Sequence, residues 1–169
     1  WLRFRVVEQV GECRPDAPEF AQMASVFDVQ FKFVAAGVEP EADATVIVHL
    51  DTSALVGAFA GSRPEIARVT GLLEEGHRLT LSTVALYEWL RGPRTAAEID
   101  VQAGLMPPQV VCAFGPAEAA LAASLYRSLR RPRGRDLDLA IAACALAQQA
   151  ALWTLNRRDF DDIPGLRLL

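Results

Sequence analysis

From Val46 onward the sequence predicts an α/β fold, a three-layer α/β/α sandwich around a mainly parallel central sheet. Short apolar runs of strand length alternate with longer helical segments, which is typical of a parallel sheet with helices on both faces. Capping residues and Gly-Pro pairs separate these segments. The chain has 169 residues, of which 51% are hydrophobic, and this is enough for one buried core.

The first half of this region is predicted to contain two strands and two helices. Residues 46–50, VIVHL, form an apolar β-branched run that ends directly before Asp51. A helix follows, and another is expected over residues 64–75, where Pro64 suits the first turn. The second strand is expected at residues 78–81, RLTL, so the segments alternate from the start.

The second half continues the alternation. A helix that contains Glu88 is expected over residues 84–92, because Ser82 or Thr83 can cap its start and Gly92-Pro93 ends it. The elements expected after it are a helix at 95–105, a strand at 109–114, helices at 116–129 and 136–150, a strand at 151–155 and an edge strand at 166–169.

Residues 1–45 differ from the rest of the chain. They hold four basic and eight acidic residues and account for the net charge of -4, since residues 46–169 hold thirteen of each. The only lysine, Lys32, lies here, and the pattern predicts no fold. We therefore expect an N-terminal extension over 1–45 and a domain over 46–169. Our hypothesis is that the extension is translated upstream sequence outside the natural product, with Val46 at the true start.

The cysteines and the hydropathy pattern indicate the cellular location that is expected for the protein. Cys13, Cys112 and Cys144 lie far apart without paired spacing, so neither a disulfide framework nor a zinc knuckle is expected. No apolar run approaches the roughly 18 residues of a membrane span, and no secretion signal is recognisable. These observations favour a cytoplasmic protein without membrane association.

Several acidic residues could carry chemistry, but each has an ordinary structural explanation. Asp51 directly follows the first strand, and it could simply cap the next helix. Glu88 lies in a helix and could pair with Arg91 or Arg94 on the solvent side. Asp138 lies in the first turn of its helix, where the helix dipole favours negative charge. None of the three is informative alone.

The combination of positions is more specific. Asp159 follows a strand as Asp51 does, and carboxyl ends of parallel strands meet at one sheet edge, where Asp138 can join them with Glu88 facing. Gathered carboxylates repel and raise one another's pKa unless a divalent cation neutralises them. Oxygen-only ligands point to Mg²⁺ or Mn²⁺. With two histidines and no cysteine pair, zinc chemistry is poorly supported.

Four motifs then resemble a known family in order and spacing: LDTSAL, STVALYEWLRG, GRDLDLAIAACALA and LWTLNRRDFDDIPGLRL. They resemble the PIN-domain family, and most closely the VapC-type toxins of type II toxin-antitoxin pairs. The resemblance covers Val46 to the end of the chain.

The resemblance implies an endoribonuclease that dimerises and that a cognate antitoxin holds inactive. It implies Mg²⁺- or Mn²⁺-dependent hydrolysis of a phosphodiester by a metal-activated water. By motif, Asp51, Glu88 and Asp138 are the first three catalytic and metal-binding acids. Asp159 supplies the fourth, although some members have an acid where this chain has Asn156, so Asn156 is an alternative for that position.

Substrate contacts are expected near these acids. Arginines at 127–135 flank the helix that contains Asp138 and could bind RNA phosphates, unless they form only a solvated loop. Asn156 or Thr154 could orient a ligand or a water. The residues assigned to substrate binding are Thr52, Ser53, Arg131, Arg133, Arg135 and Asn156.

Other classes fit less well. A receiver domain needs a lysine late in the fold, and none follows Lys32. A phosphatase of the haloacid dehalogenase type needs an aspartate where Ser53 stands. Two alternatives remain, a catalytically inactive PIN-like protein-binding module and a DNA-acting 5′-nuclease.

Overall fold

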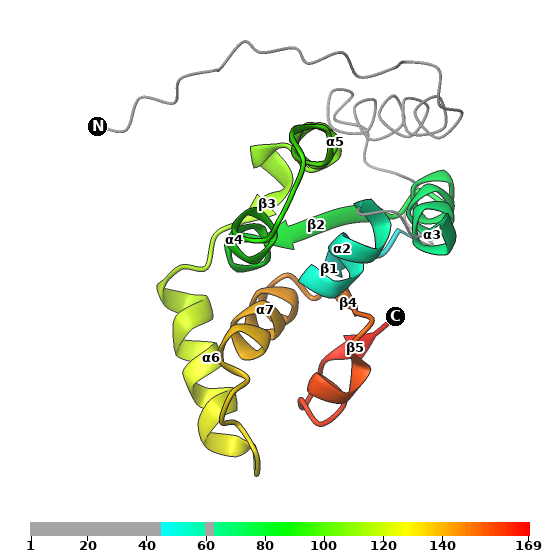
Figure 1. The fold of residues 1–169 in the computed structure, drawn as a ribbon. Coiled ribbons are helices and arrows are strands. Elements are labelled where there is room, and N and C mark those ends of the chain that lie inside the picture. The colour runs from blue at the N-terminus through cyan, green and yellow to red at the C-terminus, as the bar shows by residue number, and fades with distance from the viewer. Residues whose placement is uncertain (1–44, 60–62) are drawn as a thin grey trace.

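A computed structural model describes residues 45–59 and 63–169 and confirms the three-layer α/β/α fold (Figure 1). In this part of the chain the central sheet has five parallel strands in the order β3-β2-β1-β4-β5. The strands are β1 (Ile47–Leu50), β2 (Arg78–Ser82), β3 (Val111–Cys112), β4 (Ala151–Trp153) and β5 (Arg167–Leu168). The expected edge strand at the C-terminus is therefore present, as β5.

Helices connect the strands, and several begin with the caps that the sequence offers. The Ser82 side chain accepts a hydrogen bond from the Ala85 amide, and Thr95 forms a capping box with Glu98. The helices are α2 (Thr52–Phe59), α3 (Arg63–Glu74), α4 (Thr83–Arg91), α5 (Ala96–Leu105), α6 (Pro116–Ser128) and α7 (Asp136–Ala147). Two short 3₁₀ helices, η1 (Pro108–Val110) and η2 (Arg157–Asp159), complete the connections.

The third strand is much shorter than the sequence suggested. The expected strand at residues 109–114 is reduced to the two residues of β3, and η1 occupies the positions before it. Pro107 and Pro108 precede this segment, and proline cannot donate a hydrogen bond to a neighbouring strand. The predicted extension at 1–45, Thr45 aside, lies outside the described residues.

Helices cover both faces of the sheet. Arg68 of α3 lies over the ring of Trp153 in β4, 5.5 Å from its centroid, which places α3 on that face. The ring of His49 in β1 contacts Gln148 at the end of α7, and His49 points away from its neighbours in β1 because side chains alternate along a strand. The helix α7 therefore lies on the opposite face, with α6 packed beside it (Figure 1).

The topology defines one edge where functional groups can meet. The strand order changes direction at β1, which has β2 on one side and β4 on the other. In such sheets ligands bind beyond the carboxyl ends of the strands at this switch point. The amide of Asp51 donates to the carbonyl of Trp153 at 3.0 Å, so the first residue after β1 is fixed beside the end of β4. None of the described helices has the length and apolar character needed to cross a bilayer.

Candidate active site

Asp51 is the most firmly held acid of the edge. Its side chain is buried, and only 4% of the residue is exposed. The Oδ2 atom accepts hydrogen bonds from the hydroxyl of Ser53 at 2.5 Å, from the amide of Ser53 at 3.3 Å and from the hydroxyl of Thr154 at 2.8 Å. Within the described residues no hydrogen bond reaches Oδ1. One oxygen of Asp51 is thus used to orient the carboxylate and the other is left for a ligand.

Glu88 reaches the same edge from α4. Its Oε2 atom accepts a hydrogen bond of 2.8 Å from the hydroxyl of Thr52, at the start of α2. Its Oε1 atom pairs with Arg91 at 3.1 Å, as the sequence spacing suggested, whereas Arg94 lies over the ring of Trp89 instead. The Glu88 side chain is only 16% exposed, so the contact with Thr52 orients a carboxylate that is largely removed from water.

Asp138, in the first turn of α7, is half-buried, and its surroundings raise its pKa to about 6. The largest cause is loss of water around the carboxyl group. The negative charges of Asp159, Asp51 and Glu88 add to it, and Arg135 partly opposes it. The structure therefore brings the other three predicted acids, from three different segments of the chain, within electrostatic range of Asp138.

Asp159 and Asn156 lie in and beside η2. The backbone of η2 closes on itself through the amide of Asp159 and the carbonyl of Asn156, at 3.0 Å. The side chain of Asn156 is exposed, and its backbone N–H donates to the hydroxyl of Thr154 at 2.9 Å. Thr154 thus links Asn156 to Asp51, because the same hydroxyl donates to the Asp51 carboxylate.

The predicted substrate-binding arginines fall into two groups. Arg131 and Arg133 are exposed, so their cations are free to meet an anion. Arg135 is different, because its side chain is 13% exposed and forms an ion pair of 2.6 Å with Asp162. This pairing raises the pKa of Arg135 and lowers the pKa of Asp162. The predicted role of Arg135 in binding substrate therefore competes with an existing partner.

The four acids suit a hard divalent cation by chemistry, but they are not gathered into a chelate. In the part of the chain that the structure describes, no group of three or more His, Cys, Asp or Glu side chains is arranged to hold a metal ion. Burial is the largest cause of the raised pKa of Asp138, and repulsion from the neighbouring carboxylates adds to it. The candidate ligands are all carboxylate oxygens, and Oδ1 of Asp51 accepts no hydrogen bond among the described residues. Oxygen ligands of this kind fit Mg²⁺ or Mn²⁺ and not a softer metal.

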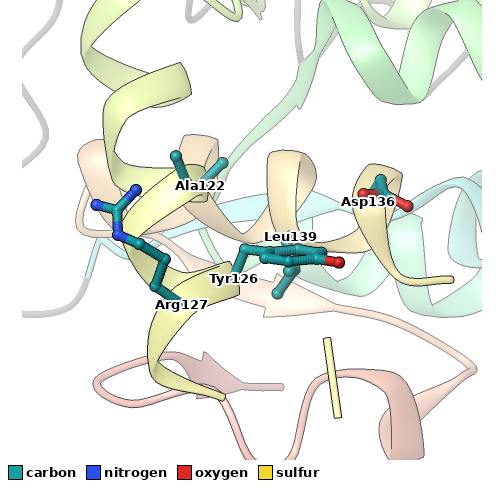
Figure 2. A pocket seen from close by; sticks show the side chains of 6 residues that line it. Ala122, Tyr126, Arg127, Asp136 and Leu139 are labelled. Carbon is teal, nitrogen blue, oxygen red and sulfur yellow. The ribbon is translucent and has the colours of Figure 1, made fainter. Parts of the chain in front are cut away.

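A separate hollow lies between α6 and α7. Figure 2 shows Tyr126, Asp136 and Leu139 among the residues that line it. None of the four predicted acids lines this hollow, although Asp136 is in the same helical turn as Asp138. It is therefore a feature of the α6 surface and is distinct from the carboxylate edge.

Two residues were not assigned in full from the sequence. Thr154 was considered only as a possible aid to a ligand or a water, whereas its hydroxyl is a direct partner of Asp51. Asp162 is assigned no role by the sequence, whereas in the structure it pairs with Arg135. The position of Thr154 directly after a strand next to β1 was a usable signal. No spacing in the sequence pointed to the pair of Asp162 with Arg135.

Comparisons with known proteins agree with this fold. A family model described as "PIN domain" matches residues 48–166 of the chain. A DNA-bound VapBC from Salmonella typhimurium is similar in structure, with 21% identity, a TM-score of 0.62, and coverage of 74% of this chain and 98% of that chain. VapBC-1 from nontypeable Haemophilus influenzae is similar at 22% identity and a TM-score of 0.58, with coverage of 73% and 96%.

A third similar structure is VapBC2 from Rickettsia felis, bound to a DNA fragment from their promoter. It has 21% identity, a TM-score of 0.58, and coverage of 73% of this chain and 97% of that chain. At these identities the likeness concerns the fold alone. No curated protein matches the sequence.

Proposed function

Because the chain belongs to the PIN domain family, we propose that it is a Mg²⁺- or Mn²⁺-dependent endoribonuclease and the toxin of a VapBC-type toxin-antitoxin pair. The observation that supports this most directly is the electrostatic state of Asp138. Three further acids, from separate segments, act on its pKa at the carboxyl edge of the sheet. Such a perturbed acid in a polar cluster is typical of a functional site.

In this proposal Asp51, Glu88, Asp138 and Asp159 hold the cation. When bound, a divalent cation polarises the phosphate and lowers the pKa of an attacking water. The chain itself supplies orientation, since hydroxyl groups fix the carboxylate oxygens that do not bind the cation.

The substrate side of the proposal uses the exposed cations. Arg131 and Arg133 bind RNA phosphates, and the exposed amide of Asn156 can orient a water or a ligand beside the acids. Thr52 and Ser53 act on substrate only through the carboxylates of Glu88 and Asp51, because their hydroxyl groups are already bonded there.

Two protein partners belong to the proposal. The solved structures that this chain resembles are toxin-antitoxin complexes, which supports a cognate antitoxin as one partner. A second copy of the chain is the other. The exposed side of α6, which includes the small residue Ala123 and Tyr126, is suited to close helix packing between copies.

Cleavage assays on the full chain test the catalytic part. The substrates are an RNA and a DNA of the same sequence, each with Mg²⁺, with Mn²⁺ and with chelator alone. We expect metal-dependent cleavage of the RNA, which Asp51→Asn or Asp138→Asn lowers roughly a thousandfold, in the range for loss of a charge-stabilising group. Asp136→Asn is the matched control, because it removes an exposed charge from the same turn of α7.

The alternatives give different results. Cleavage of the DNA alone would favour a 5′-nuclease. A folded chain that cuts neither substrate would favour an inactive protein-binding module. Metal-dependent cleavage that survives both Asp51→Asn and Asp138→Asn would remove the proposed site.

A further inference from the structure

Arg135 joins two segments that are far apart in the sequence. It is the residue directly before α7, and its guanidinium reaches the η2 region near the C-terminus. Nη1 donates to Oδ2 of Asp162 at 3.0 Å and Nη2 donates to Oδ1 at 2.6 Å, so the pair is bidentate. Nη2 also donates to the backbone carbonyl of Asp159 at 2.5 Å.

The surroundings make this contact stronger than an ordinary surface ion pair. The Arg135 side chain is 13% exposed and the Asp162 side chain 45%, so the guanidinium is largely withdrawn from water. A bidentate, charge-assisted pair fixes both the distance and the orientation of its partners, which a single contact from a lysine cannot do. The contact thus gives the η2 region a defined position relative to α7.

The two connected segments hold two of the four acids. Asp138 lies three residues after Arg135 in the same helix end, and Asp159 offers its own carbonyl to the guanidinium. The carboxylates of Asp138 and Asp159 repel each other. The contacts of the Arg135 guanidinium with the Asp159 carbonyl and with the Asp162 carboxylate therefore link the two segments that hold these repelling carboxylates.

We propose that Arg135, locked by Asp162, is a positioning residue that fixes the carboxylates of Asp138 and Asp159 relative to each other for a divalent cation. This inference rests on the proposed function and replaces the role in RNA binding that the sequence predicted for Arg135. Both terminal nitrogens of the guanidinium are engaged inside the fold. The exposed cations of Arg131 and Arg133 remain for the substrate.

The direction in which the dissociation constant for Mn²⁺ changes in Arg135→Ala separates a positioning role from an effect of charge. The full chain is titrated with Mn²⁺ by calorimetry, without RNA. A guanidinium near the site repels a cation, so loss of its charge alone predicts tighter Mn²⁺ binding in Arg135→Ala. Positioning predicts the opposite, a dissociation constant raised about tenfold or more, as is typical when an outer partner of metal ligands is lost.

Two further variants control for charge. Arg158 is exposed, directly precedes Asp159 and has no hydrogen bond or ion pair among the described residues. The variant Arg158→Ala therefore reports the effect of losing a positive charge alone. Arg135→Lys keeps the positive charge but loses the bidentate geometry. We expect Arg158→Ala to bind Mn²⁺ as tightly as the wild type or more tightly, and Arg135→Lys to bind it severalfold more weakly.

The double variant Arg135→Ala with Asp162→Asn tests whether the pair acts as a unit. It restores the net charge, so an effect of charge alone would return the Mn²⁺ affinity to that of the wild type. If the two residues act through one contact, the double variant binds as weakly as Arg135→Ala, because its effects do not add. Asp162→Asn by itself leaves the guanidinium in place and keeps the test informative should Arg135→Ala fold poorly.

Three results would overturn the inference. One is Mn²⁺ affinity in Arg135→Ala that equals or exceeds that of the wild type. Another is unchanged Mn²⁺ affinity together with weaker RNA binding, which would make Arg135 a substrate contact. The third, no uptake of Mn²⁺ by the wild type, would remove the proposed function together with the inference, and it is thereby distinguished from the first two.

Discussion

His49 lies in β1 and Asp51 directly follows this strand, and the two buried side chains have opposite surroundings. The two residues are 0% and 4% exposed, respectively. The carboxylate of Asp51 accepts three hydrogen bonds on one oxygen. Among the described residues the ring of His49 is hydrogen-bonded only to Gln148, and its Nε2 atom has no hydrogen-bond partner. The carboxyl edge of the sheet is built to hold charge, whereas the interior of the strand excludes it.

The same contrast extends to Asp138 and its surroundings. At the edge, burial and the neighbouring acids raise the pKa of Asp138 to about 6. In the interior, burial lowers the pKa of His49 to about 4, so this group stays neutral. At this edge several carboxylates lie near one another in spite of their mutual repulsion, which is the arrangement expected of a cation site.

The largest expected effect lies in the interior and concerns His49. The unfolded chain takes up a proton at His49 below about pH 6.5, whereas the folded chain does so only below about pH 4. The contribution of His49 to stability is therefore constant above pH 6.5 and is lost as the pH falls to about 4. The loss amounts to about 3 kcal/mol in order of magnitude.

Chemical denaturation of the wild type and of His49→Leu between pH 4 and pH 8 measures this effect. We expect the difference in unfolding free energy between the two to change across this window, with a steeper fall for the wild type on acidification. His77→Gln is the control, because it removes the other histidine, which is only partly buried, and it should keep the steep fall. Equal slopes for the wild type and His49→Leu would contradict the prediction.

A smaller effect is expected at the edge from Thr154→Val. This change keeps the shape of the side chain but removes the hydroxyl that donates to Asp51 and accepts from the amide of Asn156. We expect metal-dependent RNA cleavage to fall about tenfold to a hundredfold while the fold is retained, as is typical for partners of metal ligands. Thr70→Val, which removes a hydroxyl bonded to Ile66 within α3, should leave cleavage unchanged. A wild-type rate in Thr154→Val would mean that Ser53 suffices to orient Asp51.

Most of the fold was predictable because its signals are local. The β-branched run before Asp51 predicted β1, and the capping residue Ser82 predicted the start of α4. The rule that parallel strands present their carboxyl ends at one edge predicted that Asp51 and Asp159 would lie at the same edge, with Asp138 joining them from the start of a helix. These inferences needed only the order of the elements.

The parts that could not be predicted depend on tertiary contacts. The pair of Arg135 with Asp162 joins positions 27 residues apart, and neither periodicity nor composition records such a contact. The sequence therefore predicted Arg135 as a substrate-binding residue and indicated no role for Asp162. The shortness of β3 also has a tertiary cause, since an apolar run at a sheet edge extends only where its neighbour offers backbone partners.

The smallest expected effect returns to the edge and concerns the stability of Asp138→Asn. The folded-state pKa of Asp138 is raised to about 6, so above this pH the ionised carboxylate lowers the free energy of unfolding. As the pH falls toward 4, the carboxylate takes up a proton and this loss of stability disappears. With chelator at pH 8 we expect Asp138→Asn to be more stable than the wild type, by on the order of 1 kcal/mol because solvent screens a half-buried group. The gain should disappear near pH 4.

Added Mn²⁺ should reverse this order. A cation that binds only the folded state stabilises the wild type, and Asp138→Asn gains less because it has lost a carboxylate. Thermal unfolding of both proteins at pH 8, with chelator and then with Mn²⁺, measures the crossover, and Asp136→Asn should follow the wild type in both conditions. If Asp138→Asn were less stable than the wild type in chelator, burial and the neighbouring acids would not disfavour the charge of Asp138, and the contrast between a charged edge and a neutral interior would be lost.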